Sequence, residues 1–267
     1  MLLEKFLLQL IGFLSHNSFV NLMFRNFENR QKVKQEEVFS SLGLNRSLAL
    51  VKLNKVLEEL YGTGFSEKNG MWSEHLVLFA AFSEAKDNVN KILEIGTFNG
   101  ETAKILSRLF PNSLITTIDL PSSELSKSKI YSYETKNDTI FSKREANLKL
   151  APNVNFKEMN SLEFIHHETK YDLIWIDGDH SYPTAAIDIS NAVRLLTKNG
   201  IALCDDVYLY SSVQGKNGRS VATIETLSAI KDSNLINFEL IKKRLGYFFN
   251  SPKKFRKFLG VITLKNN

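Results

Sequence analysis

The sequence has 267 residues, of which 43% are hydrophobic and 24% are charged. This balance is typical of a globular protein with a buried core and excludes disorder as its main state. The net charge is +5, which permits contact with phosphate-bearing substrates, nucleic acid or anionic membranes without requiring any of them. The single cysteine, Cys204, excludes an intramolecular disulfide and lies in an apolar run, so we expect a buried thiol and a cytoplasmic protein.

The N-terminal segment is apolar but is interrupted by polar residues. These interruptions make residues 6–24 a poor transmembrane span. Glu4 and the lack of a small-residue cleavage site argue against a signal peptide. We expect an amphipathic helix that packs on its own domain or makes a homo-oligomer contact, with peripheral membrane binding as the alternative. Its apolar stripe is formed by Leu3, Leu7, Leu10, Ile11 and Leu14.

Two domains are predicted from a change of pattern near residue 70. Residues 1–70 form a helical N-terminal extension in which one helix closes at Gly62. Residues 62–70 contain three glycines and are interpreted as a hinge. Residues 71–267 alternate short β-branched runs with helical runs, which is typical of a parallel sheet built from βαβ units.

The second domain is predicted to be a doubly wound α/β fold with a mostly parallel, seven-stranded sheet. Two late strands, within 238–250 and 257–265, are too close together for a crossover helix and should pair antiparallel at the sheet edge. Such sheets bind ligands outside the carboxyl ends of their strands. The other strands are expected at 91–96, 114–120, 153–159, 172–177 and 200–206, the last after a turn at 198–200, with helices at 100–110, 138–150, 161–168 and 181–196.

A glycine-containing turn follows the first predicted strand. Gly96 and Gly100 allow the backbone to turn tightly and approach a ligand closely. Thr97 and Phe98 stand where a dinucleotide fold needs its second glycine, so NAD is disfavoured. Glu94 is available for a cationic part of another ligand.

Asp119 closes the second predicted strand, where a carboxylate can accept both hydroxyls of a ribose. The sequence LEIGTFNGET followed by TTIDL resembles the cofactor signature of class I S-adenosylmethionine-dependent methyltransferases. The resemblance implies that the turn, with Glu94, Thr97 and Asn99, holds the methionine part and that Asp119 holds the ribose. It also implies that Asn160 and Ser161 lie near the adenine, a place where such families often have an acid that this chain lacks.

Acidic residues end the fourth and fifth predicted strands. Asp177 ends the fourth, and Asp205 and Asp206 end the fifth, so the three carboxylates should converge at one rim. They would repel one another unless they are protonated or neutralised by a cation. Oxygen ligands favour a hard ion such as Mg²⁺, which lowers the pKa of a bound hydroxyl. The alternative is that Asp179 and Asp206 cap loops or helices.

His180 follows three residues after Asp177, at the predicted start of a helix. The positive end of that helix should favour the neutral imidazole that a general base needs. The alternative is a capping or buried histidine. The sequences IDGDHSY and CDDV resemble the O-methyltransferases that include the macrocin type. That resemblance implies Asp177, Asp205 and Asp206 as metal ligands, Asp177 also beside the cofactor, and His180 as the base.

The leading hypothesis is a metal-assisted O-methyltransferase acting on a small hydroxylated acceptor such as a sugar. A metal-independent methyltransferase and a non-catalytic binding protein with the same fold are the alternatives. A nucleic-acid partner is disfavoured, because IDGDHSY replaces the Asn/Asp-Pro-Pro-aromatic motif of amino-methylating enzymes. The loop at 207–220 is the preferred substrate-facing segment, and the insertion at 121–146 is a second candidate. The basic clusters at 242–244 and 253–257 are interpreted as a solvated face.

Overall fold

The computed structural model describes residues 18–86, 88–121, 124, 137–209, 220–246 and 257–265. The amphipathic segment predicted before residue 17 lies outside this part of the chain. So do most of the insertion after the second strand and most of the loop at 207–220.

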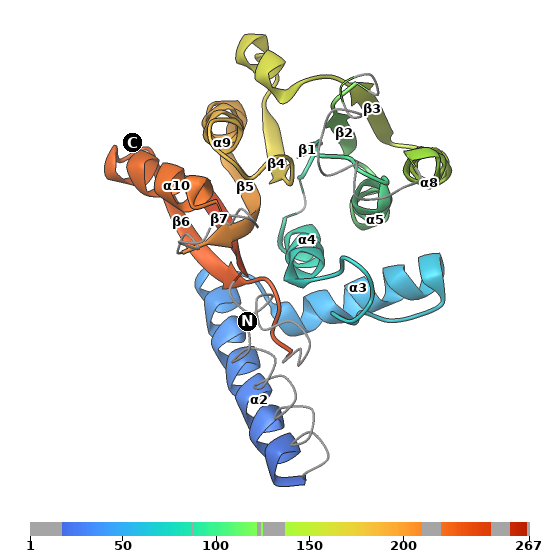
Figure 1. Cartoon of the computed structure of the whole chain (residues 1–267), viewed down its shortest axis with the longest axis vertical. Helices are drawn as coiled ribbons and strands as arrows, with labels where there is room; N and C mark the ends of the chain where they lie inside the picture. The colour runs from blue at the N-terminus through green and yellow to red at the C-terminus, as the bar shows by residue number, and fades with distance from the viewer. Residues whose placement is uncertain are drawn as a thin grey trace, which may run out of the picture.

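The described helices and strands alternate along most of the chain, as the sequence predicted (Figure 1). The helices are α2 (Ser18–Ser41), α3 (Arg46–Tyr61), α4 (Glu74–Ala85), α5 (Glu101–Leu109), α8 (Asn137–Lys149), η1 (Ser161–His166), α9 (Thr184–Leu195) and α10 (Ala222–Asp232). The strands are β1 (Lys91–Ile95), β2 (Leu114–Asp119), β3 (Val154–Glu158), β4 (Tyr171–Ile176), β5 (Leu196–Tyr208), β6 (Ile236–Lys242) and β7 (Lys257–Leu264).

The seven strands form one sheet in the order β3-β2-β1-β4-β5-β7-β6. The first five strands pair in parallel, whereas β7 is antiparallel to both β5 and β6. The predicted doubly wound, mostly parallel sheet with an antiparallel edge is confirmed. Because β6 runs in the same direction as β5, its carboxyl end reaches the same rim as those of β4 and β5. The start of β7 lies there too.

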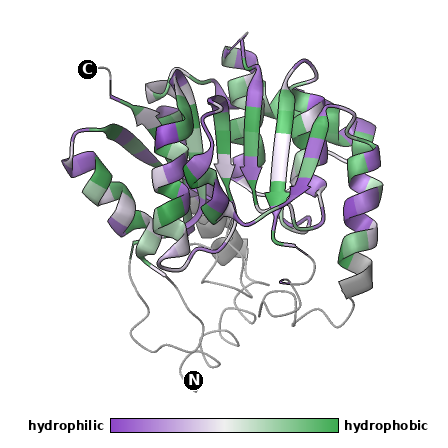
Figure 2. Cartoon of the chain, turned by 90° about the horizontal axis from the view of Figure 1, so that it is seen from above, coloured by the Kyte–Doolittle hydropathy of each residue, from purple (hydrophilic) through white to green (hydrophobic). Residues whose placement is uncertain are grey.

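Successive side chains of each strand point to opposite faces, and both faces are covered. Ile92 and Trp175 belong to a core shared with α3, α4 and α5. Leu93 and Ile174 belong to a second core with η1, α9 and α10. The central strands carry long hydrophobic stretches and the flanking helices are mixed in character (Figure 2), because a strand buried on both faces is mostly apolar.

The N-terminal helices pack against this sheet domain. Gly62 ends α3 in the left-handed conformation, as predicted, with its backbone N–H donating to Glu58. Leu53 and Leu57 of α3 belong to the same core as Ile92 of β1. The domain boundary near residue 70 stays a prediction. None of the described helices is both long enough and apolar enough to cross a membrane.

Some local details differ from the sequence prediction. The segment predicted as a helix at 161–168 is a 3₁₀ helix, and α9 begins three residues later than expected, after Pro183. The turn expected at 198–200 lies within the span of β5, at a break in its register with β4. The helix α10 was not predicted.

Candidate active site

The turn after β1 approaches the β4 loop very closely. Gly96 has a φ of 103°, and a Cβ atom there would lie 2.3 Å from the backbone oxygen of Asp177. Phe98 and Gly100 also have positive φ values, of 49° and 73°. Thr97 is buried, and Asn99 accepts a hydrogen bond from the backbone N–H of Glu101 at the start of α5. Glycine is therefore required at position 96 by sterics and favoured at position 100 by its positive φ.

Glu94 is fully buried beside this turn. Its Oε2 accepts a hydrogen bond from Thr117 at 2.5 Å, whereas its Oε1 has no partner among the described residues. Burial raises the pKa of Glu94 to about 8, although the Thr117 hydroxyl favours the charged form. A buried carboxyl oxygen without a partner fits a cationic ligand group, as predicted for the cofactor's amino group.

Asp119 lies at the carboxyl end of β2, beside the same turn. Its Oδ2 accepts from the backbone N–H of Phe98 at 2.8 Å and from Arg144 of α8 at 2.8 Å. Arg144 also donates from Nε to the backbone oxygen of Phe98 at 2.5 Å. Arg144 thus ties α8 to the predicted ribose-binding carboxylate, a contact that the sequence analysis missed.

The predicted adenine region follows β3. Asn160 caps η1, with its side-chain oxygen accepting from the backbone N–H of Leu162, and Ser161 is buried. Asp188 of α9 lies beside Ser161 and beneath Gly178, and burial raises its pKa to about 6. Asp188 is thus an acidic residue beside the predicted adenine region that the sequence order did not reveal.

Asp177 and His180 lie together at the end of β4. The Nε2 atom of His180 is 3.6 Å from Oδ1 of Asp177, and their side chains are 29% and 27% exposed. Burial, followed by the charge of Asp205, raises the pKa of Asp177 to about 7. Burial lowers the pKa of His180, but Asp177 outweighs it and the net pKa is raised. This differs from the expectation of a neutral imidazole at a helix start, because α9 begins only at Thr184.

Asp205 and Asp206 lie at a bulge in β5. The pairing of β5 with β7 shifts register between Cys204 and Val207, and Asp206 has a φ of 49°. In a regular strand neighbouring side chains point to opposite faces, but a bulge re-aims them. The two carboxylates consequently reach one cation, Lys243, which contacts Asp205 and lies 2.5 Å from Oδ1 of Asp206.

Lys243 directly follows β6 and is a site residue that the sequence analysis missed. It is buried, and so is Arg244, so the interpretation of residues 242–244 as a solvated face is wrong for these two. Lys257, at the start of β7, contacts the other oxygen of Asp206. The basic runs looked like surface because the sequence does not show that the ends of β6 and β7 meet two carboxylates. The remaining basic residues of the second cluster lie outside the described residues.

The predicted set of three aspartates does not fit a metal ion as arranged here. Both oxygens of Asp206 contact lysines, and Oδ2 of Asp205 contacts Lys243. Asp177, His180 and Asp205 do offer three ligand atoms within 4.8 Å of one another. That second set would use His180 as a ligand, although Mg²⁺ prefers oxygen. It would also place the ion beside the Lys243 ammonium.

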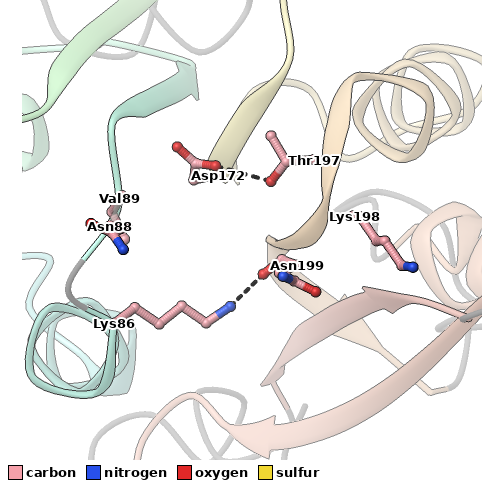
Figure 3. Close-up of a pocket in the computed structure, with 7 residues that line it drawn as sticks. All are labelled: Lys86, Asn88, Val89, Asp172, Thr197, Lys198 and Asn199. Atoms are coloured by element: carbon pink, nitrogen blue, oxygen red, sulfur yellow. Dashed lines mark hydrogen bonds between the residues drawn. The ribbon is translucent and has the colours of Figure 1, made fainter.

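A depression lies at the opposite end of the sheet from these residues (Figure 3). It has a volume of about 510 Å³ and is lined by residues before β1 and at the starts of β4 and β5, among them Lys86, Asp172 and Thr197. Asp172 accepts hydrogen bonds from the backbone N–H groups of Asn90 and Lys91 and from Thr197. This end is the amino-terminal side of the sheet, so the depression is separate from the candidate active site.

The comparisons with known proteins agree with this geometry. Residues 93–207 match the sequence model of a family described as a methyltransferase domain. The match begins in β1 and ends within β5, so it includes the turn after β1, Asp119, the Asp177–His180 pair and both carboxylates of β5. The fold is the Rossmann-like methyltransferase fold. No curated protein matches the sequence of this chain.

Several solved structures resemble this methyltransferase fold at low sequence identity. Rv0187 from MTB, in a cofactor-bound structure, is 17% identical with a TM-score of 0.53, covering 82% of this chain and 90% of its own. The SAH-bound methyltransferase PaMTH1 of Podospora anserina is 18% identical with a TM-score of 0.52, covering 82% and 88%. A Klebsiella pneumoniae protein provisionally assigned as an O-methyltransferase is 15% identical with a TM-score of 0.50, covering 91% and 100%.

Proposed function

We propose that this protein is an S-adenosylmethionine-dependent O-methyltransferase in which His180 is the general base. The observation that carries the proposal is the Asp177–His180 pair at the carboxyl rim of the sheet, beside the Gly96 turn. The methyltransferase domain match over residues 93–207 and the resemblance of IDGDHSY to O-methyltransferases support it. The acceptor would be a small hydroxylated molecule, with a sugar as one candidate.

The cofactor would be held by groups already at the turn. Glu94 would face its amino group with the oxygen that has no partner, and the close approach of Gly96 would leave room for the methionine part. Asp119 would accept the ribose hydroxyls, and Ser161, with Asp188 behind it, would lie near the adenine. When bound, S-adenosylmethionine supplies a methyl group that an acceptor oxygen can displace from sulfur.

His180 would take the proton of the acceptor hydroxyl at Nδ1, the ring nitrogen that does not face Asp177, as that oxygen forms its new bond to carbon. Asp177 would orient the imidazole and stabilise the imidazolium that results, and water would then remove the proton. Because the pKa of Asp177 is about 7 and that of His180 is raised, the pair holds a proton at neutral pH. The rate should therefore rise with pH as that proton is lost.

The test is methyl transfer from S-adenosylmethionine to a panel of sugars, phenols and alcohols, measured by mass spectrometry across pH. His180→Gln should lower the rate by roughly 10²- to 10⁴-fold and abolish the rise with pH. His166→Gln is the matched control, since His166 is exposed on η1. An unchanged methylation rate in His180→Gln would rule out His180 as the general base. Calorimetry showing no binding of S-adenosylmethionine or S-adenosylhomocysteine to the wild type would favour a non-catalytic binding protein.

A further inference from the structure

We infer that the ammonium group of Lys243 is a built-in counter-charge for Asp205 and Asp206, and that it takes the place of the divalent cation expected from the sequence. The side chain of Lys243 is only 10% exposed and contacts both carboxylates. A buried ammonium is strongly disfavoured unless it is paired, so this arrangement accounts for the lysine and the two aspartates together.

Lys243 is held in place by its backbone on both sides. Its N–H donates to the backbone oxygen of Lys257 at 3.0 Å, which fixes it to β7. Its carbonyl accepts from the backbone N–H of Glu74 at 3.0 Å, which fixes it to the start of α4. The lysine is therefore part of the packed structure and is not a surface side chain that swings over the site.

The N-terminal helices hold the residues on either side of Lys243. Gln35 of α2 donates to the backbone oxygen of Lys242 at 2.9 Å. Glu67, between α3 and α4, accepts from the backbone N–H groups of Leu245 and Gly246 at 2.7 and 2.8 Å. The helical extension thus has a function in the site, because it positions the segment that carries the lysine.

The charges at the bulge already balance. Asp205 and Asp206 carry two negative charges, and Lys243 and Lys257 carry two positive charges. A divalent ion would face both ammonium groups at close range, with Asp177 as the one further carboxylate of the predicted set. For the ion to bind, Lys243 would have to leave a buried position to which its backbone is tied.

This inference deepens the proposed function, on which its meaning for catalysis rests. Without an ion, the acceptor has no need of two neighbouring oxygens to chelate a metal. The substrate class then extends to molecules with a single reactive hydroxyl, oriented by Asp177 and His180. Lys243 is a positioning residue in this scheme, because it acts through the two carboxylates.

The test is metal binding, measured without any methyl transfer, so that its outcome is independent of the proposed function. Mn²⁺ is titrated into the whole chain and followed by electron paramagnetic resonance, and thermal unfolding is compared in EDTA and in millimolar MgCl₂. The wild type should bind no Mn²⁺ at this range and should unfold at the same temperature in both solutions. One Mn²⁺ per wild-type chain, displaced by Mg²⁺, would overturn the inference.

Lys243→Met removes the charge and keeps an unbranched side chain one atom shorter. It should unfold at a lower temperature in EDTA, gain Mn²⁺ binding by about tenfold or more, and be restored by MgCl₂. Lys243→Arg keeps the charge, so it should fold and remain insensitive to metal even if the methionine variant does not fold. Lys86→Met, at the opposite end of the sheet, is the control and should match the wild type. Mn²⁺ binding by Lys243→Arg would also overturn the inference.

Discussion

The backbone oxygen of Asp177 occupies the place where a side chain on Gly96 would begin, 2.3 Å from an ideal Cβ position. The pairing of β1 with β4 continues to this point, since the backbone N–H of Asp177 donates to the backbone oxygen of Ile95, the residue before Gly96, at 2.8 Å. The turn predicted to hold the cofactor and the loop that carries His180 are therefore one packed unit. A change in the turn should therefore alter the position of His180 as well.

Gly96→Ala should destabilise the fold by about 3 kcal/mol or more, because it combines a direct clash with a φ of 103° that alanine disfavours. Thermal unfolding and calorimetric binding of S-adenosylhomocysteine measure the two consequences. Gly178→Ala is the matched control, since its Cβ would meet nothing nearer than 3.5 Å. Equal stability of the two variants would show that the turn can relax away from Asp177.

Asp119→Asn should weaken binding of S-adenosylhomocysteine by roughly 10- to 100-fold. The asparagine side chain lacks the negative charge that pairs with Arg144. Its NH₂ group also replaces a carboxylate oxygen that accepts a backbone hydrogen bond, from Phe98 or from Leu120.

Asp172→Asn provides the control for this change. Asp172 accepts backbone N–H groups in a similar way but at the amino-terminal end of the sheet (Figure 3). It should lose stability and keep its affinity for the cofactor. A similar loss of affinity in both variants would contradict the assignment of Asp119 to the ribose.

Glu94 should make the protein less stable as the pH rises. Its pKa is raised from 4.5 to about 8 in the folded state, so the folded protein holds a proton that the unfolded chain releases. This contribution is complete below about pH 4.5 and is lost as the pH rises towards 8. Asp177 acts in the same direction, between its ordinary pKa of 3.8 and about 7.

Glu94→Gln isolates the first of these two contributions. The melting temperature of the wild type should fall more steeply between about pH 5 and 8 than that of the variant, as measured by circular dichroism. Parallel curves for the two proteins would mean that Glu94 is ionised throughout this range.

The ion pair between Arg46 and Glu74 should contribute strongly to stability. Arg46 of α3 donates to both oxygens of Glu74 at 2.8 and 2.7 Å, and both side chains are buried. Arg46→Met leaves a buried carboxylate without its partner and should cost about 3–5 kcal/mol in urea unfolding. Lys52→Met breaks a partly exposed pair with Glu84 and should cost no more than about 1 kcal/mol. Similar costs for the two variants would contradict this view of how the helices are attached.

The sequence by itself determined the sheet architecture and the edge of the sheet at which the candidate site lies. Short β-branched runs that alternate with helical runs predicted the sheet. Glycine at positions 96 and 100 predicted the tight turn, because the backbone sterics at these positions are local. Chain order also placed Asp119, Asp177 and Asp205 at the same edge of the sheet, since parallel strands bring their carboxyl ends together there.

Only the tertiary structure decided what those acids contact. Lys243 and Lys257 reach Asp205 and Asp206 because β7 is inserted between β5 and β6 and a bulge turns both carboxylates towards them. Arg144 reaches Asp119 from α8, because the fold packs that helix beside the carboxyl end of β2. Such pairings depend on strand order and register over long separations, which residue types and local spacing do not encode. The sequence could therefore predict a cluster of negative charge, but the tertiary structure determines which cation neutralises it.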